Sequence, residues 1–205
     1  MQLGNKNIID WKTILIDTNI ILSLFRAQNG SVDPEILFVN KLINYLCKSK
    51  TGKGENRTFY ISTVSLGEII TKENDSDKIK RILKVLDSEN IEFLSYDTST
   101  ALEFNIRLQP YINKDSLHVK AQELGFKAQD YGLARQWIYA DYMIAMTGFV
   151  KKSDVLITLD KNTFYPICND FKGTDCILAY SELFEHTEQF ILKYHYDKVG
   201  EFINP

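Results

Sequence analysis

Cysteine and histidine, the side chains that most often bind zinc, are scarce in this chain of 205 residues, with three of each. The cysteines have no C-x-x-C spacing, and their odd number argues against a disulfide framework. His118, His186 and His195 lie outside every motif described below, and we interpret them as surface or packing residues. Neither a zinc site nor a disulfide scaffold is therefore expected.

Long apolar runs are also absent, and none approaches the ~18 residues of a membrane span. The N-terminal stretch MQLGNKNIIDWK lacks the apolar core of a signal peptide. These absences predict a cytoplasmic protein with no membrane contact. The hydrophobic share of 44% is ordinary and is enough for a substantial core.

Neither sign of charge dominates, because the net charge is −3. This argues against a protein that holds nucleic acid mainly through a basic surface. It leaves room for a nuclease, because clustered carboxylates lower the net charge while bound cations reverse the sign of the local field.

Short apolar runs alternate with helical patterns along the chain. The predicted strands are 13–17, 59–62, 91–95, 155–158 and 176–180. The predicted helices follow the first two strands, to about 25 and 71, and then cover 34–48, 76–88, 97–109 and 130–148. Such alternation predicts an α/β fold with a parallel sheet and helices on both faces.

The predicted organisation is a single domain over 1–205, with no repeat and no convincing linker. Insertions are expected near 26–58 and 96–135, the second with two or three helices, and a helical tail is expected at 181–205. A loop is predicted at 49–58, and the basic stretch KSKTGKGENR (48–57) is either a solvated loop or a loop that contacts RNA.

Acidic side chains follow three of the predicted strands, at the sheet edge where open parallel sheets bind ligands. Asp17 ends the first strand, Glu68 lies within two turns after the second, and Asp160 follows the fourth. Each also has a structural interpretation. Asp17 or Asn19 could cap a helix, Ser65 to Glu68 has the form of a capping box, and Asp160 could form an Asx turn.

Asp141 stands in the middle of an apolar helical stripe, too far inside the helix to cap it. A buried carboxylate is costly unless it is paired, hydrogen-bonded or bound to a metal. Ion pairing with Arg135 or Lys127 is the structural alternative, although the geometry from that face is poor. A single site for all four acids would suit Mg²⁺ or Mn²⁺ rather than zinc, because its ligands are oxygens.

Four segments in order resemble the motifs of the PIN domain, a nuclease family. They are ILIDTNIIL (14–22), STVSLGEI (62–69), ADYMIAMT (140–147) and LITLDKNTF (156–164). The resemblance covers roughly 12–180. One departure is Thr163, which stands where many members of the family carry another Asp.

The resemblance implies a three-layer sandwich with strand order 3-2-1-4-5 and a ribonuclease site dependent on Mg²⁺ or Mn²⁺. It implies that the metal is held by Asp17, Glu68, Asp141 and Asp160. Thr18, Asn19 and Thr158 would support these ligands. Many similar proteins are toxins of toxin–antitoxin pairs, so a small antitoxin partner and a homodimer are implied as options, although this chain is longer.

Contacts to an RNA substrate are expected from cations near the acids. The candidates are Arg135, Lys151, Lys152 and Lys161. Trp137 is expected in the core rather than at a base-stacking position. The alternative function is a PIN-like binding module with little or no catalytic activity. A nucleotide-binding flavodoxin-like domain is a third option, which the absence of a glycine-rich loop after the first strand disfavours.

Overall fold

The computed structural model describes residues 8–72, 75–86, 91–108, 114–127, 131–169 and 175–179. The predicted helical tail at 181–205, with His186 and His195, lies outside these ranges. Within them no helix is long and apolar enough to cross a membrane.

Five parallel strands form one sheet in the order β3-β2-β1-β4-β5. Their bounds are β1 Thr13–Ile16, β2 Thr58–Ser62, β3 Ile91–Leu94, β4 Val155–Thr158 and β5 Asp175–Leu178. The α/β class and the strand order 3-2-1-4-5 are thereby confirmed. The strands are short and β-branched, and β4 is buried along its whole length, as expected for a parallel sheet covered on both faces.

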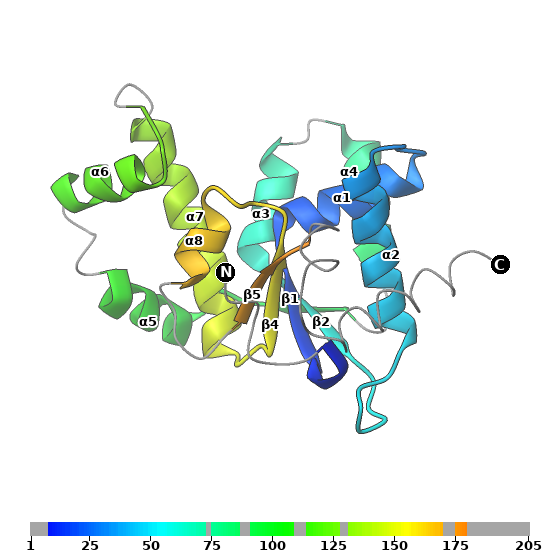
Figure 1. The fold of residues 1–205 in the computed structure, drawn as a ribbon. Coiled ribbons are helices and arrows are strands. Elements are labelled where there is room, and N and C mark those ends of the chain that lie inside the picture. Colours follow the sequence, from blue (N-terminus) through cyan, green and yellow to red (C-terminus); the bar gives the residue numbers. More distant parts are fainter. Residues whose placement is uncertain are drawn as a thin grey trace.

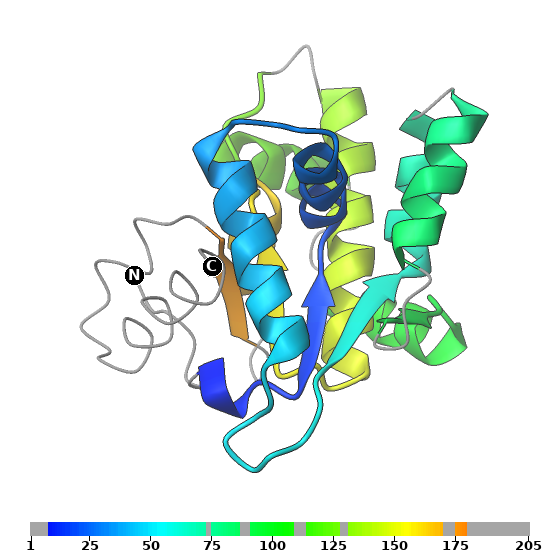
Figure 2. The ribbon, with the colours of Figure 1, turned by 90° about the vertical axis from the view of Figure 1, so that its right-hand side faces the viewer.

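Helices cover the sheet on both faces and form a three-layer arrangement (Figure 1). Their bounds are α1 Thr18–Gln28, α2 Pro34–Lys48, α3 Thr63–Lys72, α4 Ser76–Leu86, α5 Thr98–Leu108, α6 Lys114–Glu123, α7 Tyr131–Val150 and α8 Phe164–Asn169. A short 3-10 helix, Ile8–Asp10, precedes β1. Figure 2 faces the α1–α2 side and shows these two helices in front of the sheet, with α7 behind it.

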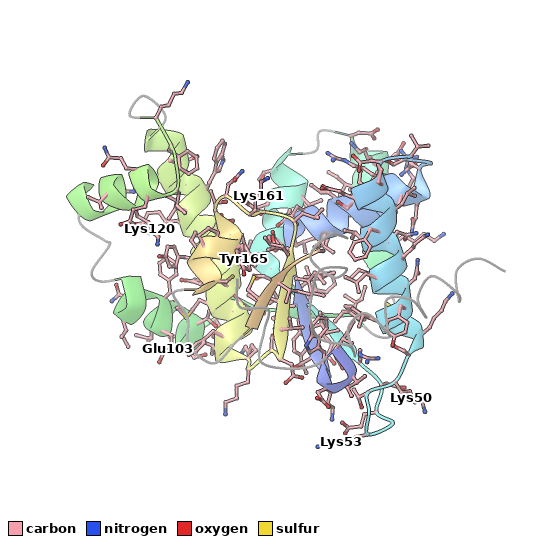
Figure 3. All side chains as sticks on the ribbon, viewed as in Figure 1. Lys50, Lys53, Glu103, Lys120, Lys161 and Tyr165 are labelled. Atoms are coloured by element: carbon pink, nitrogen blue, oxygen red, sulfur yellow. The ribbon has the colours of Figure 1, made fainter. Side chains whose placement is uncertain are left out.

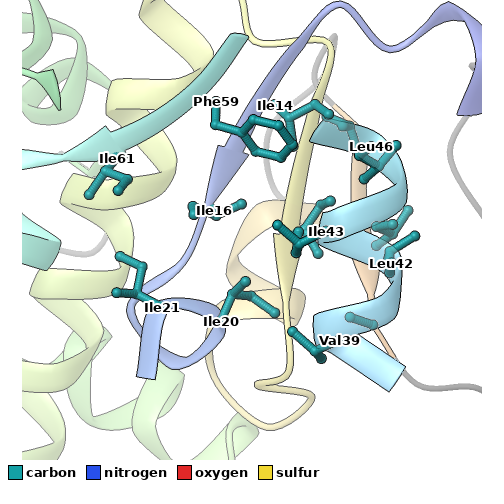
Figure 4. Close-up of a cluster of buried hydrophobic side chains, with 14 of the residues drawn as sticks. Ile14, Ile16, Ile20, Ile21, Val39, Leu42, Ile43, Leu46, Phe59 and Ile61 are labelled. Atoms are coloured by element: carbon teal, nitrogen blue, oxygen red, sulfur yellow. The ribbon is translucent and has the colours of Figure 1, made fainter. Parts of the chain in front are cut away.

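Alternate side chains of the central strands enter the two halves of the core. Ile14 and Ile16 of β1 pack toward α1 and α2, in a cluster that includes Phe59, Ile43 and other buried apolar residues (Figure 4). Leu15 points the other way and packs with α7 and α8. This alternation is the period of two that a strand imposes on its side chains.

Gly148 allows α7 to lie very close to the sheet. A methyl group at this position would lie 3.3 Å from Cδ1 of Leu15 and from Cδ1 of Leu156. These contacts are tight enough that α7 or the two leucines would have to shift. Because α7 also carries Asp141, its distance from the sheet sets how near that carboxylate comes to β1.

The two ranges predicted as insertions contain regular structure. The range 26–58 holds α2, whose N-cap is Asp33, and 96–135 holds α5, α6 and the start of α7. The loop at 49–57 precedes β2, and Figure 3 shows Lys50 and Lys53 at the opposite end of the molecule from Lys161. This placement favours the solvated-loop interpretation over contact with RNA at the acidic site.

Candidate functional site

A cleft opens at the carboxyl ends of β1 and β4, between α1, α3 and α7. We call it the acidic cleft, and its volume is about 240 Å³. It is lined by Asp17, Thr18, Asn19, Leu22, Glu68, Trp137, Asp141, Asp160 and Thr163. The four predicted acids thus line one cavity, although they come from four separate segments of the chain.

Asp17 is the most deeply placed of the four acids, with a relative exposure of 4%. The pairing of Ile16 with Ile157 brings it beside Thr158, whose hydroxyl donates a 2.7 Å hydrogen bond to Oδ2 of Asp17. The Asn19 amide donates to the same oxygen at 2.7 Å. Oδ1 accepts from the backbone N–H of Thr18 at 2.6 Å, so Asp17 also caps α1. The capping role and a place in the cleft therefore coexist.

Burial raises the pKa of Asp17 to about 7. The hydrogen bonds from Thr158 and Thr18 act in the opposite direction, and the charges of Glu68 and Asp160 add to the rise. Among the described residues, no Lys, Arg or His forms an ion pair with Asp17. The charged form of this carboxylate therefore lacks a cationic partner from that part of the chain.

Asn19 ties the loops after β1 and β4 together. Its Oδ1 accepts a hydrogen bond from the backbone N–H of Leu159 at 3.0 Å, and its amide reaches Thr158 Oγ1 at 3.2 Å. Thr158 Oγ1 in turn accepts from the backbone N–H of Asp160 at 2.9 Å. The predicted supporting residues thus form one network around Asp17 and lead to Asp160.

Glu68 projects from α3 and accepts a 2.6 Å hydrogen bond at Oε2 from the hydroxyl of Thr18. The capping-box alternative is wrong, because α3 begins at Thr63 and Ser65 lies inside the helix with its hydroxyl unpaired. Ser62 stands before the helix instead, where its Oγ accepts from the backbone N–H of Val64 at 3.2 Å. The carboxylate of Glu68 is therefore directed to the cleft.

Asp141 lies on the side of α7 that faces the sheet, where Ala134, Ile138 and Ala145 are buried. Burial raises its pKa well above the usual range, and the charge of Asp17 adds to this. Neither Arg135 nor any other cation of the described residues forms an ion pair with it. The predicted structural alternative is thus without support in this part of the chain.

Asp160 does form the predicted turn while lining the cleft. Its Oδ1 accepts from the backbone N–H groups of Asn162 and Thr163, at 2.8 and 2.9 Å. The hydroxyl of Thr163 donates to Oδ2 of Asp160, and a hydrogen bond between Thr163 and Asp141 lowers the pKa of Asp141. Thr163 therefore joins two of the acids, a role that the sequence did not reveal.

Trp137 lies at the cleft rather than in the core, which corrects the prediction for this residue. It is 48% exposed, lines the acidic cleft and contacts Phe126 at a ring-centroid distance of 5.8 Å. Among the described side chains of α7, the fully buried aromatic residue is Tyr142, which is 2% exposed. Helical spacing placed Trp137 on the inner face of α7, but that face extends past the end of the sheet at this point.

The four cations predicted to contact substrate fall into two groups. Lys151 and Lys152 precede β4, at the sheet edge opposite the cleft, and Lys151 pairs with Asp97 at 2.7 Å. Their position argues against the predicted contact with substrate. Lys161 directly follows Asp160 and is exposed (Figure 3). Arg135 is exposed on α7, with its guanidinium 5.4 Å from the ring centroid of Tyr139.

The chemistry of the cleft suits a hard divalent cation, because its charged donors are carboxylates. The buried Asp17, with no cationic partner among the described residues, is the feature that such an ion would compensate. In the described chain, no three Asp, Glu, His or Cys side chains converge closely enough to enclose an ion. Mg²⁺ does not require such a cage, since proteins commonly hold it through one or two carboxylates and leave water in its other positions.

Comparison with models of known families and with curated proteins gives no match to this sequence. Among solved structures, the fold is similar to a chain of VapBC2 from Rickettsia felis, solved with a DNA fragment from their promoter. The TM-score is 0.48 and the sequence identity 13%, over 81% of this chain and 98% of that one. A likeness at this level does not bear on the function of this chain.

Proposed function

We propose that this chain is an endoribonuclease that hydrolyses RNA phosphodiester bonds with Mg²⁺ or Mn²⁺ at the acidic cleft. One observation carries the proposal. Asp17, Glu68, Asp141 and Asp160 line the same cavity at the carboxyl end of a parallel sheet. Like charges gathered in this way oppose one another's ionisation, so their common placement is costly unless a cation offsets it.

In this proposal the four carboxylates hold the metal, one or two of them directly and the others through bound water, and Thr18, Asn19 and Thr158 orient them. A bound Mg²⁺ or Mn²⁺ would supply an activated water and charge relief on the phosphate. Asp17 is held by three hydrogen bonds from Thr18, Asn19 and Thr158, so its direction is fixed before any ion binds. Such preorganisation lowers the cost of forming a charged site.

The cellular setting of the proposal rests on the sequence resemblance alone. A cytoplasmic toxin that acts on RNA, held inactive by a small antitoxin, fits the PIN-like motifs. Homodimerisation is a further proposal of the same kind. The four acids and their hydrogen bonds do not depend on these settings, so the nuclease proposal stands independently of them.

The experiment is cleavage of a labelled single-stranded RNA by the purified chain, with Mg²⁺, Mn²⁺ or EDTA. We expect cleavage with metal, loss of cleavage in EDTA and recovery when Mn²⁺ is returned in excess. The alternative, a binding module, predicts RNA binding that persists in EDTA and no cleavage with either metal. Cleavage that continues unchanged in EDTA would reject the metal-dependent mechanism.

A further inference from the structure

A second cavity lies beside the acidic cleft and is lined by residues of α1, α3 and α4. We call it the basic groove, and its volume is about 490 Å³. Three cations line it, namely Arg26 from the last turn of α1 and Lys78 and Arg81 from α4. The described residues that line it include no acid.

One carboxylate, that of Asp75, lies near the groove and offsets part of its positive charge. The backbone N–H groups of Lys78 and Asp77 hold the pKa of Asp75 below its usual value, and the charges of Arg81 and Lys78 add to this. Asp75 therefore lies within the field of two of the cations while it caps the start of α4. Of the described residues, three cations and no acid line the groove, so this lining carries net positive charge even with Asp75 beside it, in a chain whose total charge is −3.

The floor of the basic groove is apolar. Leu22, Phe25 and Ile69 line it, and the Arg81 guanidinium lies 6.0 Å from the ring centroid of Phe25. Leu22 also lines the acidic cleft, so the two cavities adjoin at this side chain. A ligand that leaves the acidic cleft past Leu22 therefore enters the basic groove directly.

The acidic cleft by itself is a poor place for a polyanion. Its four carboxylates repel phosphates outside the immediate metal site, and Lys151 and Lys152 are at the other edge of the sheet. A nucleic-acid substrate needs cations along its backbone, since neutralised phosphates release counterions and supply most of the affinity. The basic groove, which shares Leu22 with the cleft, offers three such cations.

We propose that the basic groove binds the phosphate backbone of single-stranded RNA on its way into the acidic cleft. This rests on the proposed nuclease function and adds the class of substrate. Arg26, Lys78 and Arg81 would contact phosphates, while the apolar floor accepts unstacked bases. On the opposite side of the cleft, the exposed Trp137 of α7 offers a second surface on which only an unpaired base can stack.

The test measures binding without catalysis. A fluorescent single-stranded RNA oligonucleotide is titrated in EDTA by anisotropy, at several salt concentrations, with wild type and with the triple variant Arg26→Gln, Lys78→Gln, Arg81→Gln. For single strands each lost phosphate contact reduces the slope of log K against log salt by about 0.7. We therefore expect the slope to fall by about 2 in the triple variant, with at least a roughly tenfold loss of affinity at low salt.

The control for each single neutralisation is Lys80→Gln, which removes one positive charge from α4 outside the groove. Lys80 does not line the groove, and its ammonium pairs with Asp77 at 3.3 Å on an exposed surface. This variant should keep the wild-type affinity and salt slope. The single variant Arg26→Gln, on α1, should show about one third of the reduction in salt slope that the triple variant shows. It keeps the test valid if the triple variant misfolds.

Several outcomes would overturn the inference. These are an unchanged slope in the triple variant, an equal effect of Lys80→Gln, tighter binding of a duplex than of the single strand, and no binding of RNA at all. Binding of an acidic peptide in place of RNA, lost in the triple variant, would also overturn it and assign the groove to a protein partner.

Cleavage of RNA is measured separately with Mn²⁺. Groove-dependent binding without cleavage refutes the proposed function, whereas cleavage with groove-independent binding refutes only this inference.

Discussion

The hydroxyl of Thr18 donates a 2.6 Å hydrogen bond to Oε2 of Glu68, and its backbone N–H donates at 2.6 Å to Oδ1 of Asp17. One residue at the start of α1 therefore contacts two of the four acids. The first bond joins α1 to α3, so the position of Glu68 depends on a residue 50 positions earlier.

Replacing Thr18 by Val removes the hydroxyl and keeps the shape of the side chain. Thr18 is 6% exposed, and the lost hydrogen bond has a charged acceptor. We expect the free energy of unfolding in EDTA to fall by about 1–2 kcal/mol. Urea denaturation measures this. Thr18→Ser keeps the hydroxyl and should stay close to wild type, and equal losses in the two variants would show that the hydroxyl is not the cause.

Asp141→Asn should stabilise the metal-free protein at neutral pH. The pKa of Asp141 is raised in the folded state by burial and by Asp17, so ionisation costs stability once the pH exceeds the unfolded pKa, which is about 3.9. Below that pH the carboxyl is protonated in both states and the cost vanishes. The variant should therefore melt higher than wild type near pH 7, and the difference should shrink toward pH 4.

Thermal scans across this pH range, each with EDTA and with excess Mn²⁺, distinguish a metal-binding role of Asp141 from a structural one. Mn²⁺ should raise the melting temperature of wild type more than that of Asp141→Asn, because binding to the folded state stabilises by mass action. A variant that melts lower than wild type in EDTA and responds equally to Mn²⁺ would identify Asp141 as a structural partner of a cation.

Trp137 provides a direct optical signal for the substrate. The chain has two tryptophans, and Trp11 is 2% exposed while Trp137 is 48% exposed and lines the cleft. Single-stranded RNA in EDTA should quench the emission of Trp137 by stacking and leave that of Trp11 unchanged. Trp137→Phe should abolish the quenching and retain much of the affinity. Quenching that survives in this variant would place the base elsewhere.

The fold could be predicted well because its sequence signals are local. The predicted strand 155–158 matches β4, and the predicted helix 34–48 matches α2, whose start is fixed by Asp33 and Pro34. Short β-branched runs separated by amphipathic segments leave few arrangements other than a parallel sheet. The strand order, by contrast, was implied by the resemblance and depends on long-range pairing that no local pattern encodes.

The positions of the four acids could be anticipated, but the way each is held could not. Strand ends predict the sheet edge, and an acid within the apolar stripe of α7 predicts a position facing the sheet. The hydrogen-bond partners of the acids could not be predicted, because most of them come from other segments of the chain. Thr158 donates to Asp17, and Thr163 bonds to Asp160 and Asp141. The sequence alone does not show which carboxylate a given hydroxyl group will contact.

The positions of Trp137, Lys151 and Lys152 relative to the cleft differ from expectation for a common reason. Helical periodicity gives the face of a residue but not its height along the helix relative to the sheet. Trp137 is on the inner face near the start of α7, where the sheet has ended, and the two lysines follow the other end of the helix. About 20 Å separates these levels along a helix that rises ~1.5 Å per residue.

The most direct test of the central claim is metal-dependent cleavage of single-stranded RNA by Asp17→Asn. Asp17 is the buried carboxylate held by three hydrogen bonds, so its charge should be indispensable to the metal. Glu68→Gln is the second variant, because its amide oxygen can still accept from Thr18. Glu55→Gln is the control, since Glu55 pairs with Lys12 in the loop before β2. We predict that the rate of Mn²⁺-stimulated cleavage falls at least roughly a hundredfold in Asp17→Asn, while its circular dichroism spectrum stays unchanged. The rate should also fall in Glu68→Gln and should equal that of wild type in Glu55→Gln. Full activity in folded Asp17→Asn would contradict the account.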